Sequence, residues 1–552
     1  MPNVITIRIK NNNTCLQMPL GCSLTDVYKE SGLQLEYGPI AAYVNNKSQG
    51  LNYRFYNSKD VQFLTLHDDS GMHTYVRSLF LVLSKAVEDV FPGGGYIMDG
   101  AGSQGFYCRL RIGRPVKDED AQAILCRMRE IVGAKMPIHR IQCPIEEAIE
   151  VFRSRGLESK AQLLETQSSL YAYYYQLGNT VDYFYSSLMT NTGQLHLFHL
   201  ERMGEGLLLR VPSQENPALR TQGPAQPKAM AAIAEHQRWL DIMDVRTVGE
   251  LNAASKAGHI TELINVAEAL QERKLTRIAD EIKERNAKIV LIAGPSSSGK
   301  TTTSKRLAIQ LMCCGIRPHT ISTDNYFVDR DKSPRAENGE FDFEHIGAVD
   351  TRLFNEHMTA LLKGERVELP RYDFPSGKSV FEGNYLQIAE NDVIILEGNH
   401  ALNPIMSEQI PEESKYRIFV SPLSTIALDD HNNIPTSDIR LLRRILRDYR
   451  YRNYPAVETI HRRRSVERGE KRWILPFQEE ADATFNSALL YELNVIREQV
   501  MPILQQVGER EPEYSEASRL RKFLSYLVPV PGDQVPPTSL LREFAGGSSF
   551  KY

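Results

Sequence analysis

The 552-residue sequence has no long hydrophobic run and no large excess of charge of either sign. No apolar stretch approaches the ~18 residues that a membrane-spanning helix needs, and the N-terminus lacks the basic-then-apolar pattern of a secretion signal. The formal net charge is −4, so no overall field draws the chain to nucleic acid or to a membrane. These absences predict a cytoplasmic protein with no membrane partner.

Cysteine is scarce as well. The seven cysteines are odd in number and scattered, with no metal-ligand spacing, which excludes a disulfide framework and a zinc site of ordinary pattern. They are typical of reduced thiols. The hydrophobic content of 42% and the charged content of 24% are those of a globular chain. At roughly 150 residues per domain, the length predicts about three or four domains.

One glycine-containing stretch, residues 294–301 (GPSSSGKT), matches the phosphate-binding pattern G-x-x-x-x-G-K-[ST]. It follows the apolar run 289–293 and precedes residues 302–312, which have the apolar spacing of a helix. A strand, a loop and a helix in this order predict a nucleoside triphosphate site, because backbone N–H groups and the helix N-terminus attract phosphates. The alternative is a Ser/Gly-rich connection without a ligand. The expected nucleotide-binding residues are Gly294, Pro295, Ser296, Ser297, Ser298, Gly299, Lys300, Thr301 and Thr302.

Two carboxylates follow predicted strands near this loop in the fold. Asp324 comes directly after the strand 318–323, and Glu397 ends the apolar strand 392–397. Carboxylates at the carboxyl ends of strands beside a phosphate loop are placed to act on a substrate hydroxyl or on Mg²⁺. The alternative for Asp324 is that it only caps a turn.

Further motifs in the same order resemble the uridine kinase and phosphoribulokinase family. The S-x-D-x-F-Y pattern is met by 322–327, P-x-Y-D-F by 370–374, E-G by 397–398 and R-R-x-x-R-D by 443–448, and F-D-H-P-x-A-F-D is echoed by 343–350, with Glu344 where the family has an aspartate. The resemblance implies a P-loop α/β kinase with a parallel sheet that uses ATP and Mg²⁺. It implies that Asp324 accepts the proton of the attacking hydroxyl and that Lys300, Arg447 and Arg452 act on the phosphates.

The same resemblance implies which further residues bind the metal and which bind the acceptor. Thr301, Glu397 and Asp324 would hold Mg²⁺. Glu344 and Arg444 would bind ribose-like hydroxyls, and Tyr372 would also contact the acceptor. An arginine-rich helix is often only a solvated face, and this alternative applies most to residues 462–464.

Two departures from the family pattern concern the acceptor. In the family's nucleoside kinases, Y-D-F is followed by two residues and then by a base-contacting histidine, where this chain has Gly377. Loss of one buried hydrogen bond costs about 1–3 kcal/mol, which weakens the case for uridine. The lid sequence R-G-R becomes Arg452-Asn453-Tyr454, so a tyrosine replaces one phosphate arginine.

The N-terminal half carries two weaker resemblances. Residues 1–66 are similar to the β-grasp TGS domain of threonyl-tRNA synthetases, and 67–215, with predicted helices at 75–92 and 118–131, resemble the second additional (editing) α+β domain of those enzymes. The editing pairs H-x-x-x-H and C-x-x-x-H fall on Arg77 and Leu81 and near Ser187 and Asn191, so the editing chemistry is not expected. The tyrosines between 171 and 185 could stack on bases, although a packed strand is the more common role.

The complete chain is therefore expected to be a multidomain α/β and α+β protein. The expected divisions are 1–66, 67–215, a helical connector over 216–287, a kinase over 288–510, and a C-terminal helix and tail over 511–552. A helix is expected over 484–506 and a mobile tail over 544–552.

The predicted function is ATP-dependent phosphorylation of the 5′-hydroxyl of a nucleoside such as uridine or cytidine. Two alternatives stay open: a kinase of a sugar or polyol, and an RNA- or ribosome-associated regulator that uses a nucleoside triphosphate. No basic patch in the sequence supports RNA as a partner, and an oligomer is compatible with it.

Overall fold

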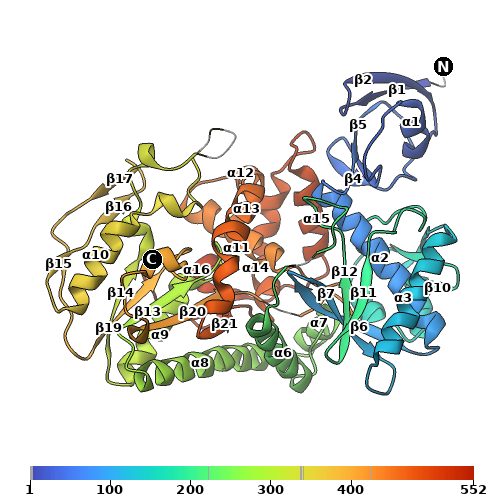
Figure 1. Ribbon diagram of the computed structural model, residues 1–552. Helices are drawn as coiled ribbons and strands as arrows, with labels where there is room; N and C mark the ends of the chain where they lie inside the picture. Colours follow the sequence, from blue (N-terminus) through green and yellow to red (C-terminus); the bar gives the residue numbers. More distant parts are fainter. Residues whose placement is uncertain (1–3, 222, 336–338, 340, 424–425) are drawn as a thin grey trace.

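A computed structural model describes residues 4–221, 223–335, 339, 341–423 and 426–552. Residues 1–3 of the expected first module lie outside this set. Figure 1 shows the kinase-like sheet on the left, a helical layer in the middle and two N-terminal units on the right, the first of them at the top. Within the described ranges, no helix combines the length and apolar character needed to cross a bilayer.

The first unit is a β-grasp fold, as expected. Its sheet has the order β2-β1-β5-β3-β4, and β1 and β5 run parallel. Ser23 caps the helix by accepting a hydrogen bond from the Asp26 N–H, and the Asp26 carboxylate accepts one from the Ser23 N–H. Its elements are β1 (Val4–Ile9), β2 (Thr14–Pro19), α1 (Leu24–Glu30), β3 (Ala41–Val44), β4 (Lys47–Gln49) and β5 (Lys59–Leu64).

The second unit is an α+β domain with two antiparallel sheets, of order β11-β12-β7-β6 and β10-β9-β8. The expected helices are present, and the first is longer than predicted at its N-terminus. Its elements are α2 (Asp69–Val90), β6 (Gly95–Gly102), β7 (Gly105–Arg111), α3 (Asp118–Gly133), β8 (His139–Pro144), α4 (Ile145–Ser154), α5 (Glu158–Glu165), β9 (Tyr171–Leu177), β10 (Thr180–Asp182), β11 (His199–Met203) and β12 (Gly206–Arg210).

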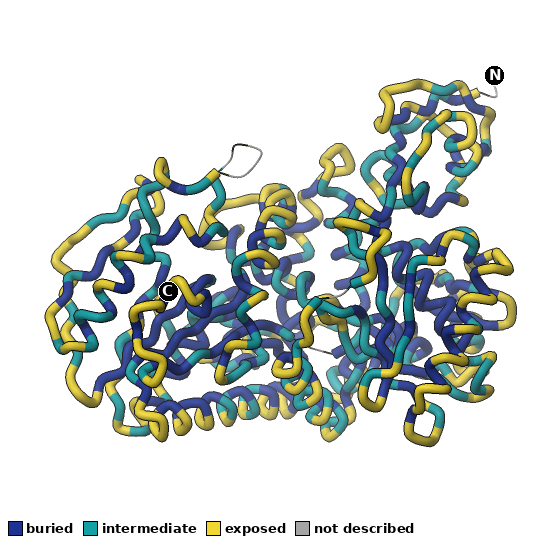
Figure 2. Tube along the Cα trace, viewed as in Figure 1, coloured by how far each residue is buried: buried dark blue, intermediate teal, exposed yellow. Residues whose placement is uncertain are grey.

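Three connector helices, α6 (Pro227–Ile242), α7 (Val248–Lys256) and α8 (Ile260–Glu284), lead to the kinase unit. Its sheet is entirely parallel, with the order β14-β19-β13-β20-β21. Its strands are β13 (Ile289–Ala293), β14 (Arg317–Ser322), β19 (Asp392–Glu397), β20 (Lys415–Ser421) and β21 (Ala483–Asn486). Every residue of β13 and β19 is buried, as continuous apolar strands in a covered parallel sheet require, and Figure 2 shows the sheet in dark blue.

Helices and short hairpins surround this sheet. The main helices are α9 (Lys300–Cys313), α10 (Thr351–Leu362), α11 (Thr436–Tyr451), α12 (Ala456–His461), α13 (Arg463–Trp473), α14 (Glu492–Gln505), α15 (Tyr514–Leu524) and α16 (Arg542–Ala545). The hairpin strands are β15 (Val367–Glu368), β16 (Arg371–Asp373), β17 (Lys378–Val380) and β18 (Tyr385–Leu386), and a 3₁₀ turn, η1 (Thr323–Tyr326), follows β14.

Two expectations about the C-terminal part are wrong. The predicted helix over 484–506 begins as strand β21, where Phe485 lies opposite Val420 of β20, and only α14 is helical. Pairing at the sheet edge overrides the helical spacing of the apolar residues. The tail expected to be mobile is packed: Phe544 is fully buried, and its ring lies 5.2 Å from the Arg443 guanidinium. Burial of such aromatic surface fixes the chain.

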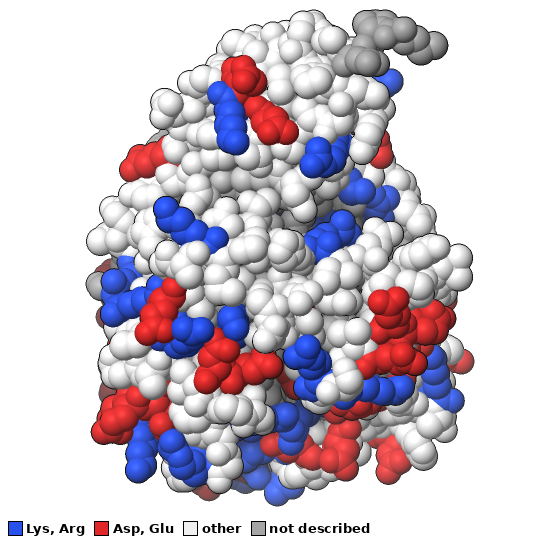
Figure 3. Space-filling model, turned by 90° about the vertical axis from the view of Figure 1, so that its right-hand side faces the viewer, with Lys and Arg blue, Asp and Glu red and all other residues white. Residues whose placement is uncertain are grey.

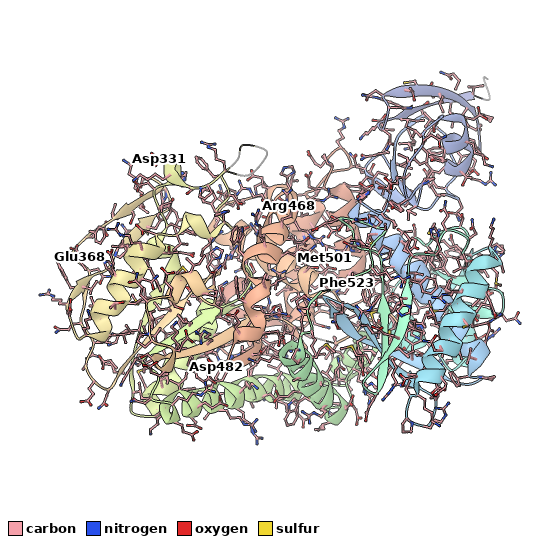
Figure 4. All side chains as sticks on the ribbon, viewed as in Figure 1. Asp331, Glu368, Arg468, Asp482, Met501 and Phe523 are labelled. Atoms are coloured by element: carbon pink, nitrogen blue, oxygen red, sulfur yellow. The ribbon has the colours of Figure 1, made fainter. Side chains whose placement is uncertain are left out.

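One hydrophobic core joins the second unit to the C-terminal helices. It contains residues of β8 to β10, α4 and α5 together with α11, α14 and α15. Figure 4 labels Met501 and Phe523, which lie in this middle layer. A buried ion cluster lies beside it: Lys160 Nζ is 2.8 Å from both Asp182 and Asp429, and Asp182 also accepts from His431 at 2.7 Å. Removal of one partner of such a cluster leaves an uncompensated buried charge, so the cluster fixes how the two parts meet.

Candidate active site

The phosphate loop connects β13 to α9. Ser297 and Gly299 have positive φ angles of 59° and 89°, and at Gly299 a Cβ atom would lie 2.7 Å from Leu540. Residue 299 is therefore a glycine because a side chain would strain the backbone and would lie too close to Leu540. Within the described residues, the buried hydroxyls of Ser297 and Ser298 have no hydrogen-bond partner. Buried polar groups are rarely left unpaired, so the loop is suited to a ligand that accepts hydrogen bonds.

Lys300 begins α9 and lies across this loop. Its ammonium donates to the carbonyls of Gly294 (2.9 Å) and Pro295 (3.2 Å) and to Oδ1 of Asn399 (2.8 Å). Loss of hydration lowers the pKa of Lys300, although nearby carboxylates, first Glu397, act against this shift. The ammonium is thus held against the phosphate loop by two of the loop's own carbonyls and by Asn399.

The two carboxylates expected near a metal lie together beside Lys300. Ser322 is the register partner of Glu397, so β14 and β19 end at the same edge of the sheet. Thr301 Oγ1 lies 3.5 Å from Glu397 Oε1. Burial raises the pKa of Glu397 to about 7, and burial also raises the pKa of Asp324, against the opposing charges of Lys300, Arg452 and Arg447.

A bound cation would stabilise the charged form of these two buried carboxylates, whose pKa values are raised. No group of three or more His, Cys, Asp or Glu side chains with metal-site spacing occurs among the described residues. Mg²⁺ nevertheless commonly takes only one or two carboxylates and completes its shell with water and phosphate oxygens. Thr301 and Glu397, with Asp324 nearby, therefore form a donor set that suits Mg²⁺ on a bound phosphate.

Glu344, expected to bind acceptor hydroxyls, is joined to Lys300 of the phosphate loop through Asn399, whose Nδ2 donates to Glu344 Oε2 at 3.2 Å. Burial and then the charge of Glu470 raise the pKa of Glu344 to about 7, while Arg444 lowers it. Helix α13 packs closely here, since a Cβ at Gly469 would lie 2.4 Å from that of Glu344. Glu344 is therefore held in place from two sides.

The three expected arginines of α11 and its C-terminal end converge on one buried carboxylate. Asp448 lies 3.4 Å from Arg444, 3.0 Å from Arg447 and 3.6 Å from Arg452. Arg447 and Arg452 also act electrostatically on Asp324. Arg447 and Arg452 are thus within electrostatic reach of the carboxylate that follows β14. Figure 1 shows α11 beside the sheet, between it and α14.

Tyr372 lies in an aromatic cluster. Its buried ring is 5.5 Å from that of Phe327, just after η1, and 5.1 Å from that of Phe374. Further along the same hairpin, Gly377 has φ +69° and a Cβ there would lie 2.8 Å from Arg330. A side chain at residue 377 would strain the backbone and would lie too close to Arg330, which occupies this region. Tyr454 is held beneath Arg462, 5.0 Å from the guanidinium to the ring centroid.

Sequence reasoning missed three residues of the site: Asn399, Glu470 and Glu543. Asn399 links Lys300 to Glu344, and Glu470 accepts from the Ser296 N–H at 3.1 Å. The position of Asn399 directly after the E-G motif was a usable signal. Glu470 and Glu543 had none, because their contacts depend on the path of the chain far from the loop.

The C-terminal segment reaches the phosphate loop. Glu543 accepts hydrogen bonds from the Thr302 N–H at 3.3 Å and the Thr302 hydroxyl at 2.6 Å, and Tyr552 contacts the same hydroxyl at 2.9 Å. A carboxylate at the N-terminus of α9 occupies a position that favours any anion. Glu543 thus stands where a phosphate would be expected, and Figure 1 shows the C-terminus over the sheet.

The strand order, the phosphate loop and the carboxylates at the strand ends define a P-loop kinase fold. The family model described as "Phosphoribulokinase / Uridine kinase family" matches residues 289–490. A uridine kinase from Mycoplasma genitalium is 31% identical over 170 residues, which cover 31% of this chain and 71% of that protein. The chain belongs to the phosphoribulokinase and uridine kinase family.

This chain covers a smaller share of the length of other relatives. A uridine kinase from Halobacterium salinarum is 31% identical over 157 residues, 28% of this chain and 60% of that protein. The N-terminal region matches a threonine–tRNA ligase from Methylococcus capsulatus, 27% identical over 232 residues, 41% of this chain and 36% of the ligase. The composite architecture expected from the sequence is thereby confirmed.

Proposed function

We propose that the protein transfers the γ-phosphate of ATP to a hydroxyl of a small acceptor, the 5′-hydroxyl of a nucleoside such as uridine or cytidine. The observation that carries this proposal is the convergence of Lys300, Thr301 and Glu397 with Asp324 at one end of the parallel sheet. Phosphoryl transfer needs positioning and charge neutralisation more than covalent chemistry, and these side chains supply both.

Each side chain then has a role. The loop N–H groups and Lys300 bind the phosphates, and Thr301 and Glu397 hold Mg²⁺, which neutralises charge on the phosphate oxygens when bound. Asp324 accepts the proton of the attacking hydroxyl, and its raised pKa brings it closer to the pH at which it works. Arg447 and Arg452 stabilise the charge that develops on the transferred group. Glu344 and Arg444 orient the acceptor's hydroxyls.

A second candidate acceptor is a sugar or polyol. Gly377 offers no side chain to a base, and the Arg330 guanidinium fills the space beside it. The test is to incubate the pure protein with ATP, Mg²⁺ and a panel of nucleosides, sugars and polyols, and to measure ADP release with each. Turnover of uridine or cytidine well above the ATPase background is expected. Turnover of only sugars or polyols would overturn the nucleoside assignment, with the kinase chemistry intact.

The Glu543 carboxylate is expected to compete with nucleotide phosphate for Thr302. Glu543→Gln should increase ATP affinity about 5- to 20-fold, because it removes a negative charge from the helix N-terminus and from the neighbourhood of Glu397. Isothermal titration calorimetry measures the change. Asp533→Asn, which removes an exposed charge from the same segment, is the control. Equal or weaker ATP binding by Glu543→Gln would show that the carboxylate supports the site.

A further inference from the structure

Three segments that are distant in the sequence meet between the first two units and the C-terminal helices. They are β4 of the first unit, the α2, β8 and β9 region of the second, and α15. Asn46, next to β4, donates to the carbonyls of Glu509 and Arg510, each at 3.1 Å, just before α15. Figure 3, which views the molecule from the right-hand side of Figure 1, shows several basic side chains in the band below the unit at the top, whereas basic and acidic side chains are mixed lower down.

Four cations from these segments lie at this junction: Lys522, and Lys47, Arg77 and Arg140, each of which acts electrostatically on Lys522. Loss of hydration and the repulsion of the other three lower the pKa of Lys522 to about 7. None of the four makes an ion pair with any carboxylate among the described residues. Arg77 instead donates to the Ser187 carbonyl, at 3.3 Å, and to the Thr74 hydroxyl.

Two of the cations lie against one aromatic ring. The Arg140 guanidinium is 4.0 Å from the Tyr173 ring centroid, and Lys522 Nζ is 4.4 Å from it. Lys522 also donates to the Tyr173 hydroxyl. Cation–π contacts hold the two charges in fixed positions without neutralising them. Tyr173 therefore serves as a support for cations rather than as a free stacking surface for a base.

The carboxylates of Asp438, on α11, and of Glu516, on α15, are paired with other arginines. Asp438 and Glu516 each lie 2.7 Å from Arg519, and Glu516 also binds Arg463. Lys47, Arg77 and Arg140 thus keep an uncompensated positive charge in a partly dehydrated junction, where Lys522, with a pKa of about 7, is only partly protonated at neutral pH. Holding like charges together in this way is unfavourable, and proteins do so where an anion is bound.

We propose that Lys47, Arg77, Arg140 and Lys522 form a binding site for phosphate esters, separate from the phosphate loop. Arginine binds phosphate oxygens through paired N–H groups, and lysine adds a mobile charge. A phosphate group, with up to two negative charges, matches this surplus better than one carboxylate does. The ligand is either a free phosphorylated small molecule or the terminal phosphate of an RNA, and this site does not depend on the kinase assignment.

The test follows the reactivity of Lys522 in the intact protein. Acetic anhydride at about pH 7.5 modifies unprotonated amines, and peptide mass spectrometry gives separate rates for Lys522 and Lys300. The probes are inorganic pyrophosphate and a 5′-phosphorylated uridine tetranucleotide. Either probe is expected to slow acetylation of Lys522 about 5-fold or more, because a bound phosphate both covers the amine and favours its charged form.

Variants separate this site from the phosphate loop. Arg140→Met should raise the probe concentration that protects Lys522 about 10-fold and leave protection of Lys300 by pyrophosphate unchanged. Arg129→Met, an exposed change of the same charge in the same unit, should alter neither. Stronger protection by the RNA, lost at high salt, would identify RNA as the source; protection by pyrophosphate alone would identify a small molecule. Protection of Lys300 without protection of Lys522 by either probe would overturn the proposal.

Discussion

Asp324→Asn is expected to lower kcat about 10²- to 10⁴-fold while it changes ATP affinity little, because an amide cannot accept the proton of the attacking hydroxyl. Asparagine keeps the size and polarity of the side chain, so the 3₁₀ turn that holds residue 324 should persist. Steady-state kinetics with the acceptor found in the panel would measure kcat, and calorimetry would measure ATP binding.

The matched control is Asp331→Asn, which removes an exposed carboxylate seven residues further along and away from the sheet in Figure 4. It should leave kcat unchanged. An Asp324→Asn protein that turns over at the wild-type rate would show that another group takes the proton.

The same residue should shape the pH dependence of the reaction. Burial raises the pKa of Asp324, and only the deprotonated carboxylate can accept a proton. kcat/KM should therefore fall as the pH decreases, with an acid limb above the ordinary aspartate value of about 4. Glu344 and Glu397, each with a pKa of about 7, titrate in the same direction, so the limb belongs to the group of carboxylates. Because all three carboxylates lose their charge as the pH falls, kcat/KM should decline steeply.

Lys300→Ala is the second change with a large expected effect. It removes the cation that faces the bound phosphates, and kcat/KM for ATP should fall about 10²- to 10⁴-fold. In the structure this ammonium is held by the Gly294 and Pro295 carbonyls and by Asn399. Its loss therefore also frees Asn399, which positions Glu344 on the acceptor side. The Michaelis constant of the acceptor should rise together with that of ATP.

Lys363→Ala, an exposed lysine after α10, provides the control for loss of a positive charge. Thermal unfolding of both variants would separate a functional effect from misfolding. Phosphorylation at the wild-type rate by Lys300→Ala would contradict every function assigned to the loop.

Much of the kinase unit was predictable because its signals are local. The fully buried strands β13 and β19 contain the continuous apolar runs 289–293 and 393–396, and the loop between β13 and α9 carries its own glycine and lysine pattern. Asp324 and Glu397 could be placed because parallel strands end at a common edge. The roles given to these residues stay predictions until the variants are measured.

The parts that could not be predicted depend on contacts between distant segments. Phe485 forms a strand because β20 offers an open edge, although its neighbours have helical spacing. The tail was expected to be mobile because its own sequence has no regular pattern, and it is fixed by burial of Phe544 against Arg443. Local pattern cannot report a partner that lies elsewhere in the chain.

The sequence alone determined the order of the domains, the phosphate loop and the acidic groups beside it, since each rests on short-range pattern and strand polarity. Only the tertiary structure decided what covers that loop and what surrounds Lys522. Glu543 is 241 residues from Thr302, and Lys522 is 349 residues from Tyr173. Contacts over such separations arise from the packing of whole units, which is set by the total buried surface and by the pairing of buried charges.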